Sequence, residues 1–204
     1  MTTGHVAAVY ARLGNTDMSE TDPPKAETWD GRAEAKGREE NAGKARETAD
    51  RLFPGHGWEK VEDGIYLSPR RAVGKKSSYK DELRNAHILR DLGSTVYFVP
   101  ESKRQGDKKF DAIVDGLNFE FKNVTGGTGA LQRRFLESRA QAPNVFINLE
   151  NSSLTTREIM SALYGARNSP KYPEISKFSG GMILLKVKGM ENLVCLNTDD
   201  LKAG

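Results

Sequence analysis

An Asp115-Gly116 pair stands between two β-prone runs, 109–114 and 117–122, and constrains the fold more than any other feature of the chain. Asp-Gly favours a two-residue type I′ turn, because both central positions of that turn need a positive φ angle. A turn of this kind sets the register of its two strands and brings Asp111 directly opposite Glu120. We therefore predict a β-hairpin with its tip at Asp115 and Gly116.

Alternation along the strands divides the side chains of the hairpin between two faces. The apolar face is predicted to hold Phe110, Ala112, Val114, Leu117, Phe119 and Phe121. The other face is predicted to hold Asp111, Ile113, Asn118, Glu120 and Lys122. Two carboxylates opposite each other repel, and a divalent cation with oxygen ligands would offset that repulsion.

This polar face predicts a small active site. Asp111 and Glu120 are the expected ligands of Mg²⁺ or Mn²⁺, because Mg²⁺ typically takes one or two carboxylates together with water and substrate phosphate. Lys122 follows Glu120 on the same face and could orient the attacking water or stabilise developing negative charge. The alternative is a half-exposed hairpin whose outer face is simply polar.

The residues around the hairpin predict further elements. Helical periodicity covers 78–92 and 130–142, and short apolar strands are expected at 95–99 and 144–149. The order is then helix, strand, strand, strand, helix, strand, in which the crossover helix implies parallel pairing within a mixed sheet. Glu82 shares a flank of the first helix with apolar residues and could point toward the sheet, although a glutamate in a first turn can also simply satisfy the helix dipole.

This order of elements, with four residues in it, resembles the PD-(D/E)XK nuclease superfamily over about 78–149. Within that superfamily it is most similar to the tRNA nuclease domain at the C-terminus of bacterial contact-dependent inhibition toxins. The letters that carry the likeness are Glu82, Ala86, Leu89, Gly93, Val96, Phe98, Pro100, Glu101, Asp111, Ala112, Gly116, Glu120 and Lys122. Phe110 stands where the superfamily name has a proline.

The resemblance implies roles for four residues. Asp111 and Glu120 would bind the metal, Lys122 would be catalytic, and Glu82 would complete the cluster. It also implies tRNA as the substrate and a growth-inhibiting toxin with a cognate immunity protein.

The remaining segments extend this core into an α+β domain. Residues 1–53 are expected to form a flexible N-terminal segment and a charged helix from 31 to 53, and 54–204 to form the nuclease-like domain. A small hairpin is predicted at 58–67, a helix at 155–166, and a last hairpin that pairs 182–187 with 192–196.

Composition excludes several classes of protein. The single cysteine, Cys195, rules out a disulfide framework within the chain, and the three histidines have no spacing that suggests a zinc site. No apolar run is long enough for a membrane span, and no signal peptide is recognisable. We expect the chain to work in reducing cytoplasm, where it is made or to which a larger toxin delivers it.

Basic residues are concentrated around the predicted metal site, although the net charge is only +3. Lysines and arginines in such positions contact nucleic-acid phosphates. The predicted contacts are Arg70, Arg71, Lys75, Lys76, Lys108, Lys109, Arg133 and Arg134. The leading interpretation is a metal-dependent nuclease that cleaves tRNA. The alternatives are a DNA endonuclease of the restriction, repair or mobile-element kind, and a non-catalytic nucleic-acid-binding or phage structural protein.

Overall fold

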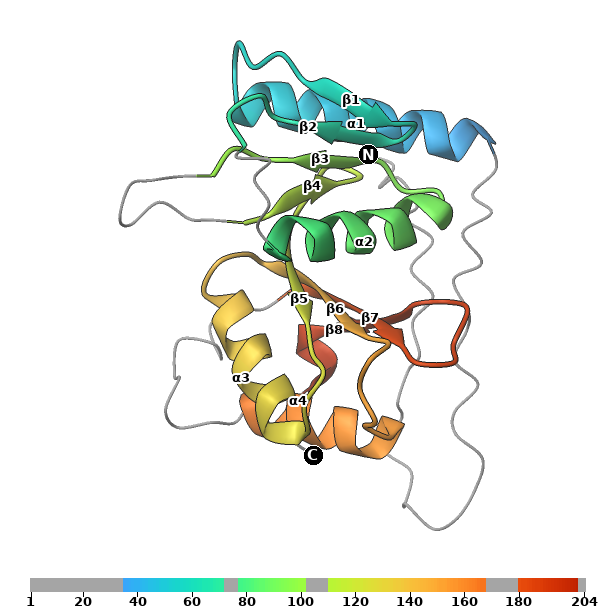
Figure 1. The fold of residues 1–204 in the computed structure, drawn as a ribbon, viewed down its shortest axis with the longest axis vertical. Coiled ribbons are helices and arrows are strands. Elements are labelled where there is room, and N and C mark those ends of the chain that lie inside the picture. Colours follow the sequence, from blue (N-terminus) through green and yellow to red (C-terminus); the bar gives the residue numbers. More distant parts are fainter. Residues whose placement is uncertain (1–34, 72–76, 102–109, 168–179, 202–204) are drawn as a thin grey trace.

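One mixed sheet forms the centre of the protein. The computed structural model describes residues 35–71, 77–101, 110–167 and 180–201 (Figure 1). Within these ranges the sheet has eight strands, arranged in the order in which they occur along the chain. They are β1 (Glu59–Glu62), β2 (Ile65–Leu67), β3 (Val96–Phe98), β4 (Ala112–Val114), β5 (Leu117–Asn123), β6 (Asn144–Leu149), β7 (Met182–Val187) and β8 (Val194–Asn197).

Helices make the parallel connections of this sheet, and turns make most of the antiparallel ones. The α-helices of the described residues are α1 (Ala35–Leu52), α2 (Ser77–Asp91), α3 (Thr128–Arg139) and α4 (Thr156–Arg167). The parallel pairs are β2 with β3, β5 with β6, and β6 with β7, and α2, α3 and α4 lie between their strands in the chain. This arrangement follows from geometry, since parallel neighbours need a long crossover.

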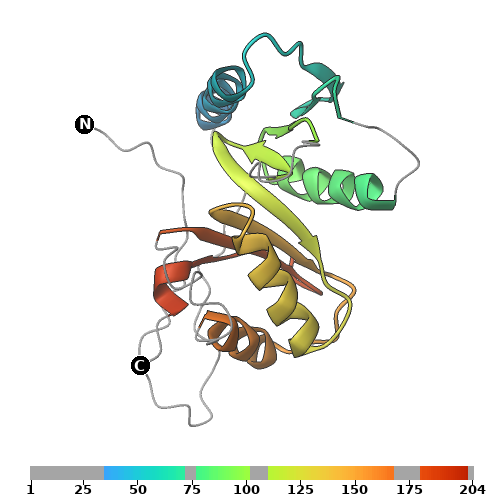
Figure 2. The ribbon, with the colours of Figure 1, turned by 90° about the vertical axis from the view of Figure 1, so that its left-hand side faces the viewer.

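The helices lie on opposite faces of the sheet. α2 packs through Ala86 and Leu89 on the face that carries Phe98, Phe119 and Phe121. The other face is covered by α1 beside β3 and β4, and by α3 and α4 beside β5, β6 and β7. Figure 2 shows β5 as the long strand that runs from the part with α1 toward the part with α3 and α4.

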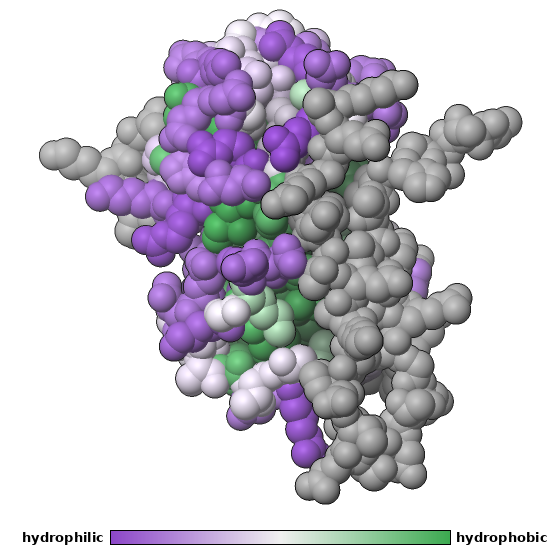
Figure 3. Space-filling view, turned by 90° about the vertical axis from the view of Figure 1, so that its right-hand side faces the viewer, coloured by the Kyte–Doolittle hydropathy of each residue, from purple (hydrophilic) through white to green (hydrophobic). Residues whose placement is uncertain are grey.

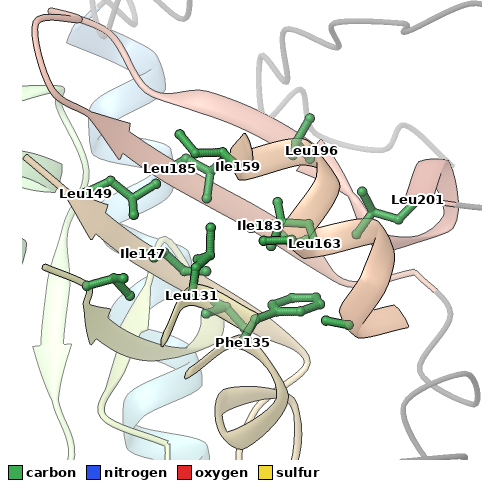
Figure 4. Close-up of a cluster of buried hydrophobic side chains, with 14 of the residues drawn as sticks. Leu131, Phe135, Ile147, Leu149, Ile159, Leu163, Ile183, Leu185, Leu196 and Leu201 are labelled. Atoms are coloured by element: carbon green, nitrogen blue, oxygen red, sulfur yellow. The ribbon is translucent and has the colours of Figure 1, made fainter. Parts of the chain in front are cut away.

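The largest hydrophobic cluster lies under α3 and α4. Side chains of the two helices interlock there with inward-facing residues of β6, β7 and β8 (Figure 4). Those labelled in the figure are Leu131, Phe135, Ile147, Leu149, Ile159, Leu163, Ile183, Leu185, Leu196 and Leu201. Burial on this scale stabilises the C-terminal half, because each fully buried aliphatic or aromatic side chain contributes about 1.5–3 kcal/mol.

The predicted hairpin is confirmed. Asp115 and Gly116 have φ angles of 49° and 87°, as a type I′ turn requires. β4 and β5 pair in the predicted register, with Ala112 opposite Phe119 and Val114 opposite Leu117. The predicted order of helix, three strands, helix and strand is also confirmed by α2, β3, β4, β5, α3 and β6. The chain is therefore a mixed α+β protein.

One residue assigned to the apolar face of the hairpin lies on the other face, and a second is exposed. Phe110 packs against the cluster of Tyr97, Val99 and Ile113 on the opposite face. It precedes β4, where the strict alternation of a strand no longer holds. Leu117 pairs with Val114 and so faces the predicted side, but it is 38% exposed because it lies next to the turn.

Several other predictions fall on residues outside the described ranges, among them the flexible segment over the first 30 residues. Where the chain is described, none of the helices combines the length and the apolar character that a membrane span needs.

Figure 3 shows hydrophilic residues gathered over one end of the visible face and a band of hydrophobic residues below them. Half-buried side chains such as Met182 and Leu184 pack around the cluster beneath α2.

Replacing Gly116 with alanine is expected to destabilise the protein. The left-handed conformation costs a residue with a side chain about 1–2 kcal/mol. A Cβ atom at position 116 would also lie 3.3 Å from the backbone oxygen of Lys44 in α1. Urea unfolding measures the loss of free energy.

Gly189→Ala is the matched control, because Gly189 has a φ of 78° and open space around its added Cβ atom. Its loss reports the strain of the conformation alone. A loss at Gly116 no larger than that at Gly189 would show that the contact between the hairpin tip and α1 contributes nothing.

Candidate functional site

Asp111 and Glu120 lie beside each other, although the regular register of the hairpin ends with Ala112 opposite Phe119 and does not pair Asp111 directly with Glu120. The Asp111 N–H donates to the carbonyl of Phe119 at 3.0 Å, and the Phe121 N–H donates to Asp111 Oδ2 at 2.8 Å. The second contact holds the Asp111 carboxylate against β5, next to Glu120. Glu120 itself is almost entirely buried, with 2% of its surface exposed.

The surroundings of Glu120 disfavour its negative charge. Burial and the adjacent Asp111 carboxylate raise the pKa of Glu120 to about 8, although Lys122 opposes this change. Its Oε2 atom is buried and has no hydrogen-bond partner. A buried acceptor without a donor is costly, so this atom indicates a position where a cation or another donor would be favourable.

Lys122 completes the polar row on β5. Its Nζ donates to Glu120 Oε1, and its side chain keeps 15% exposure. In the parallel register with β6, Glu120 lies beside Val145 and Lys122 beside Ile147. Val145 and Ile147 belong to the cluster under α3 and α4, so Glu120 and Lys122 lie on the sheet face that these helices cover.

Glu82 is close to the site but is occupied by another partner. Its Oε2 accepts a hydrogen bond from Arg71 Nη2, within an ion pair whose two side chains are 18% and 5% exposed. Burial raises the pKa of Glu82, with Arg71 opposing and Asp111 adding to the shift. Glu82 therefore lies close enough to Asp111 for the two charges to interact, and the Arg71 guanidinium forms ion pairs with both carboxylates.

Arg71 was predicted to contact phosphate at the surface, but its side chain is buried. Only 6% of the residue is exposed, and its guanidinium donates to the carbonyls of Val99 at 2.8 Å and Asp111 at 3.0 Å. Sequence reasoning assigned it to a basic surface cluster. An arginine that follows a short strand gives no sign by itself that its side chain points inward. The sequence therefore contains no signal for the buried contacts of Arg71.

The other predicted phosphate contacts lie in three situations. Arg70 is exposed next to Arg71. Arg133 and Arg134 are exposed on α3, where both lie within 4 Å of the Glu137 carboxylate. Such surface pairs contribute little energy, so both arginines remain available to an anion. Lys75, Lys76, Lys108 and Lys109 lie outside the described residues.

Metal coordination would need ligands beyond the protein. In the described parts of the chain, no three side chains of His, Cys, Asp or Glu gather closely enough to hold a metal ion. Asp111 and Glu120 supply two carboxylates. Mg²⁺ commonly binds in this way, through one or two carboxylates, with waters and substrate phosphate as the remaining ligands.

A pocket lined mostly by polar residue types, which the sequence did not indicate, lies where β5 and β6 end. Its lining consists of Asp81, Arg84, Asn123, Val124, Thr125, Asn148 and Asn151. Asn148 is fixed there, since its Nδ2 donates to Asn85 of α2 and its Oδ1 accepts from the Glu150 N–H. Asn123 and Asn148 stand at the carboxyl ends of two strands predicted to be parallel, and this pattern could have indicated the pocket.

Comparison with known proteins finds one family and one structure. Residues 108–184 match the family described as "Contact-dependent growth inhibition CdiA C-terminal domain". A solved structure, "CdiA-CT/CdiI toxin and immunity complex from Burkholderia pseudomallei", is similar with 20% sequence identity and a TM-score of 0.43, over 62% of this chain and 91% of that chain. No curated protein matches. The segment that holds Asp111, Glu120 and Lys122 is therefore similar to the C-terminal domain of CdiA.

Proposed function

We propose that this protein is a metal-dependent nuclease of the PD-(D/E)XK type that cleaves tRNA. The observation that carries the proposal is the Asp111–Glu120 pair, two adjacent carboxylates, one just before β4 and one in β5, with Lys122 hydrogen-bonded to Glu120. Two carboxylates can hold a divalent ion, and a lysine beside them can stabilise developing negative charge, so the arrangement suits metal-assisted hydrolysis of a phosphodiester.

The residues present fit a bound Mg²⁺ or Mn²⁺. Glu120 Oε2 is buried without a partner, and burial together with the adjacent Asp111 carboxylate raises the pKa of Glu120 to about 8. Both features would be relieved by a positive charge next to the two carboxylates. Asp111 and Glu120 would hold the ion, which when bound polarises the phosphate and lowers the pKa of a coordinated water.

The remaining groups of the site have roles in binding and orientation. Lys122 donates hydrogen bonds from a position next to Glu120 and can stabilise the negative charge that develops on the phosphate oxygens. The exposed Arg70, Arg133 and Arg134 can contact the phosphate backbone. Together they bind a polyanion without reading its sequence, as expected for recognition of RNA by its shape.

We also propose that the chain is the toxic part of a contact-dependent inhibition system. The family that matches residues 108–184 is named for that process, and the match includes Asp111, Glu120 and Lys122. A toxin of this kind would act in the cytoplasm of the cell into which it is delivered. The cell that makes a tRNA nuclease must also be protected from it, so we propose a cognate immunity protein.

The first test compares cleavage of total tRNA and of plasmid DNA by the protein and by Asp111→Asn, Glu120→Gln and Lys122→Met. Cleavage of tRNA should need Mg²⁺ or Mn²⁺ and stop in chelator. Both carboxylate variants should lose it, and Lys122→Met should be slower by about 10²–10³-fold because a preorganised donor is gone. Gel electrophoresis of the products measures the rates.

Asp63→Asn is the matched control, since Asp63 is a fully exposed acid whose partner is Lys60. It should cut like the parent protein. Cleavage of DNA in place of tRNA would move the substrate assignment to a DNA endonuclease. Undiminished cutting by Glu120→Gln would refute the site.

The stability of the metal-free protein should depend on the charge of Glu120. Its pKa is about 8 in the folded protein and 4.5 ordinarily, so the folded state favours the protonated acid. The resulting stabilisation is complete below pH 4.5 and is lost as the pH rises through 8. In chelator, Tm should therefore fall between pH 5 and 8 more in the parent protein than in Glu120→Gln.

Differential scanning calorimetry of both proteins across this range measures the difference. Glu82, whose pKa is also raised by burial, remains in both proteins and cancels from the comparison. If Tm changed with pH equally in the parent protein and in Glu120→Gln, ionisation of Glu120 would not destabilise the folded state.

The exposed arginines of α3 should contribute to the salt dependence of RNA binding. Each phosphate contact that is removed lowers the slope of log K against log salt by about 1. In an Asp111→Asn background that cannot cut, Arg133→Ala with Arg134→Ala should flatten this slope, as measured by fluorescence anisotropy with tRNA. The double control Arg51→Ala with Arg157→Ala removes the same charge from α1 and α4. If the two double variants had equal slopes of log K against log salt, the RNA would bind away from α3.

A further inference from the structure

Arg71 connects the separate elements that meet at the site. Its Nη1 donates to the carbonyl of Val99, just after β3, and to the carbonyl of Asp111, just before β4. Its Nη2 donates to Glu82 of α2 and lies 3.8 Å from Asp111 Oδ1. One guanidinium therefore contacts both the backbone and the carboxylate side of Asp111.

The turn that follows β2 directs this arginine inward. The Ser68 N–H donates to the carbonyl of Phe98, and the Arg71 N–H donates back to the carbonyl of Ser68. Ser68 Oγ accepts from the Arg70 N–H, which closes the turn locally. The chain thus reverses beside β3, and the Arg71 guanidinium lies over the Phe98 ring, 5.1 Å from its centroid.

The planar guanidinium suits this position for a physical reason. It offers several N–H donors in a fixed plane, so it can serve two carbonyls and a carboxylate at once while stacking on an aromatic ring. An ammonium group carries the same charge but cannot reproduce that arrangement. Glu82 balances the buried charge, which would otherwise be costly.

We propose that Arg71 is a positioning residue that holds Asp111 in place for metal binding, with Glu82 as its anchor. This proposal rests on the proposed function, in which Asp111 is a metal ligand. It assigns Glu82 to the support of Arg71 and leaves Asp111 and Glu120 as the two carboxylates that face the ion. Groups that orient ligands in this way typically change metal affinity or activity by about 10–100-fold when they are altered.

The experiment uses the full chain and the variants Arg71→Lys, Glu82→Gln and Glu120→Gln. Its first readout needs no metal: hydrogen exchange of the Phe121 and Val99 amides, which donate to Asp111 Oδ2 and to the Asp111 carbonyl. Arg71→Lys should speed exchange of both amides relative to amides of β6. Arg90→Lys is the matched control, because Arg90 also pairs with acids near α2 but contacts Glu62 and Asp91.

The second readout is Mn²⁺ binding, followed by electron paramagnetic resonance of the free ion. Arg71→Lys should weaken Mn²⁺ binding by about 10–100-fold and lower kcat for tRNA with little change in KM. Glu82→Gln keeps a hydrogen-bond acceptor for Arg71, so it should weaken Mn²⁺ binding much less than Glu120→Gln does.

Three results would overturn the positioning role of Arg71. The first is unchanged exchange of the Phe121 and Val99 amides in Arg71→Lys, and the second is a lower Tm with unchanged Mn²⁺ affinity, which would mark a purely structural residue. The third is a raised KM with unchanged Mn²⁺ affinity, which would mark a direct phosphate contact. If Glu82→Gln lowered the affinity for Mn²⁺ as much as Glu120→Gln does, the anchor role of Glu82 would be overturned. Absence of Mn²⁺ binding by the parent protein would instead refute the proposed function, while the exchange data would still decide whether Arg71 positions Asp111.

Discussion

The repulsion between Asp111 and Glu120 is the interaction around which the site is arranged. Two neighbouring carboxylates, one of them almost fully buried, are unfavourable unless nearby groups compensate. Lys122 compensates on one side of Glu120, and Arg71 does so behind Asp111. Glu120 Oε2 still lacks a donor. The protein therefore tolerates a local cost to stability at the position where a cation would be most strongly favoured, a pattern typical of functional sites.

The fold supports this arrangement from both faces of the sheet. α2 and its aromatic cluster lie behind the strands, while α3 and α4 build the largest core on the side of Glu120 and Lys122. β5 belongs to both regions, since Phe119 and Phe121 pack under α2 and the alternate residues face the other way. Packing on both sides leaves β5 little freedom to move. The polar row on that strand is consequently held on a rigid element, which favours accurate placement of reacting groups.

The predictable parts of the structure were those governed by local chemistry. The Asp-Gly turn requires a particular geometry, so the hairpin and its register back to Ala112 opposite Phe119 followed from sequence. Asp111 lies near Glu120, but outside that regular pairing. Phe110 departed from prediction because alternation applies only inside a regular strand and Phe110 precedes β4. Arg71 could not be placed, since its inward direction depends on a turn at Ser68 and on the carbonyls of Val99 and Asp111, which come from distant parts of the chain. Long-range contacts of this kind leave no local pattern.

The order of the strands has a consequence for how the chain reaches its folded state. Every strand of the sheet pairs with the strands that precede and follow it in the sequence. Assembly thus requires no strand to be inserted between two that are already paired, and each new strand adds to an existing edge. Because closing shorter loops costs less entropy, topologies rich in sequence-local pairing tend to fold quickly. A chain that entered a compartment in the unfolded state could rebuild this sheet progressively, beginning from either end.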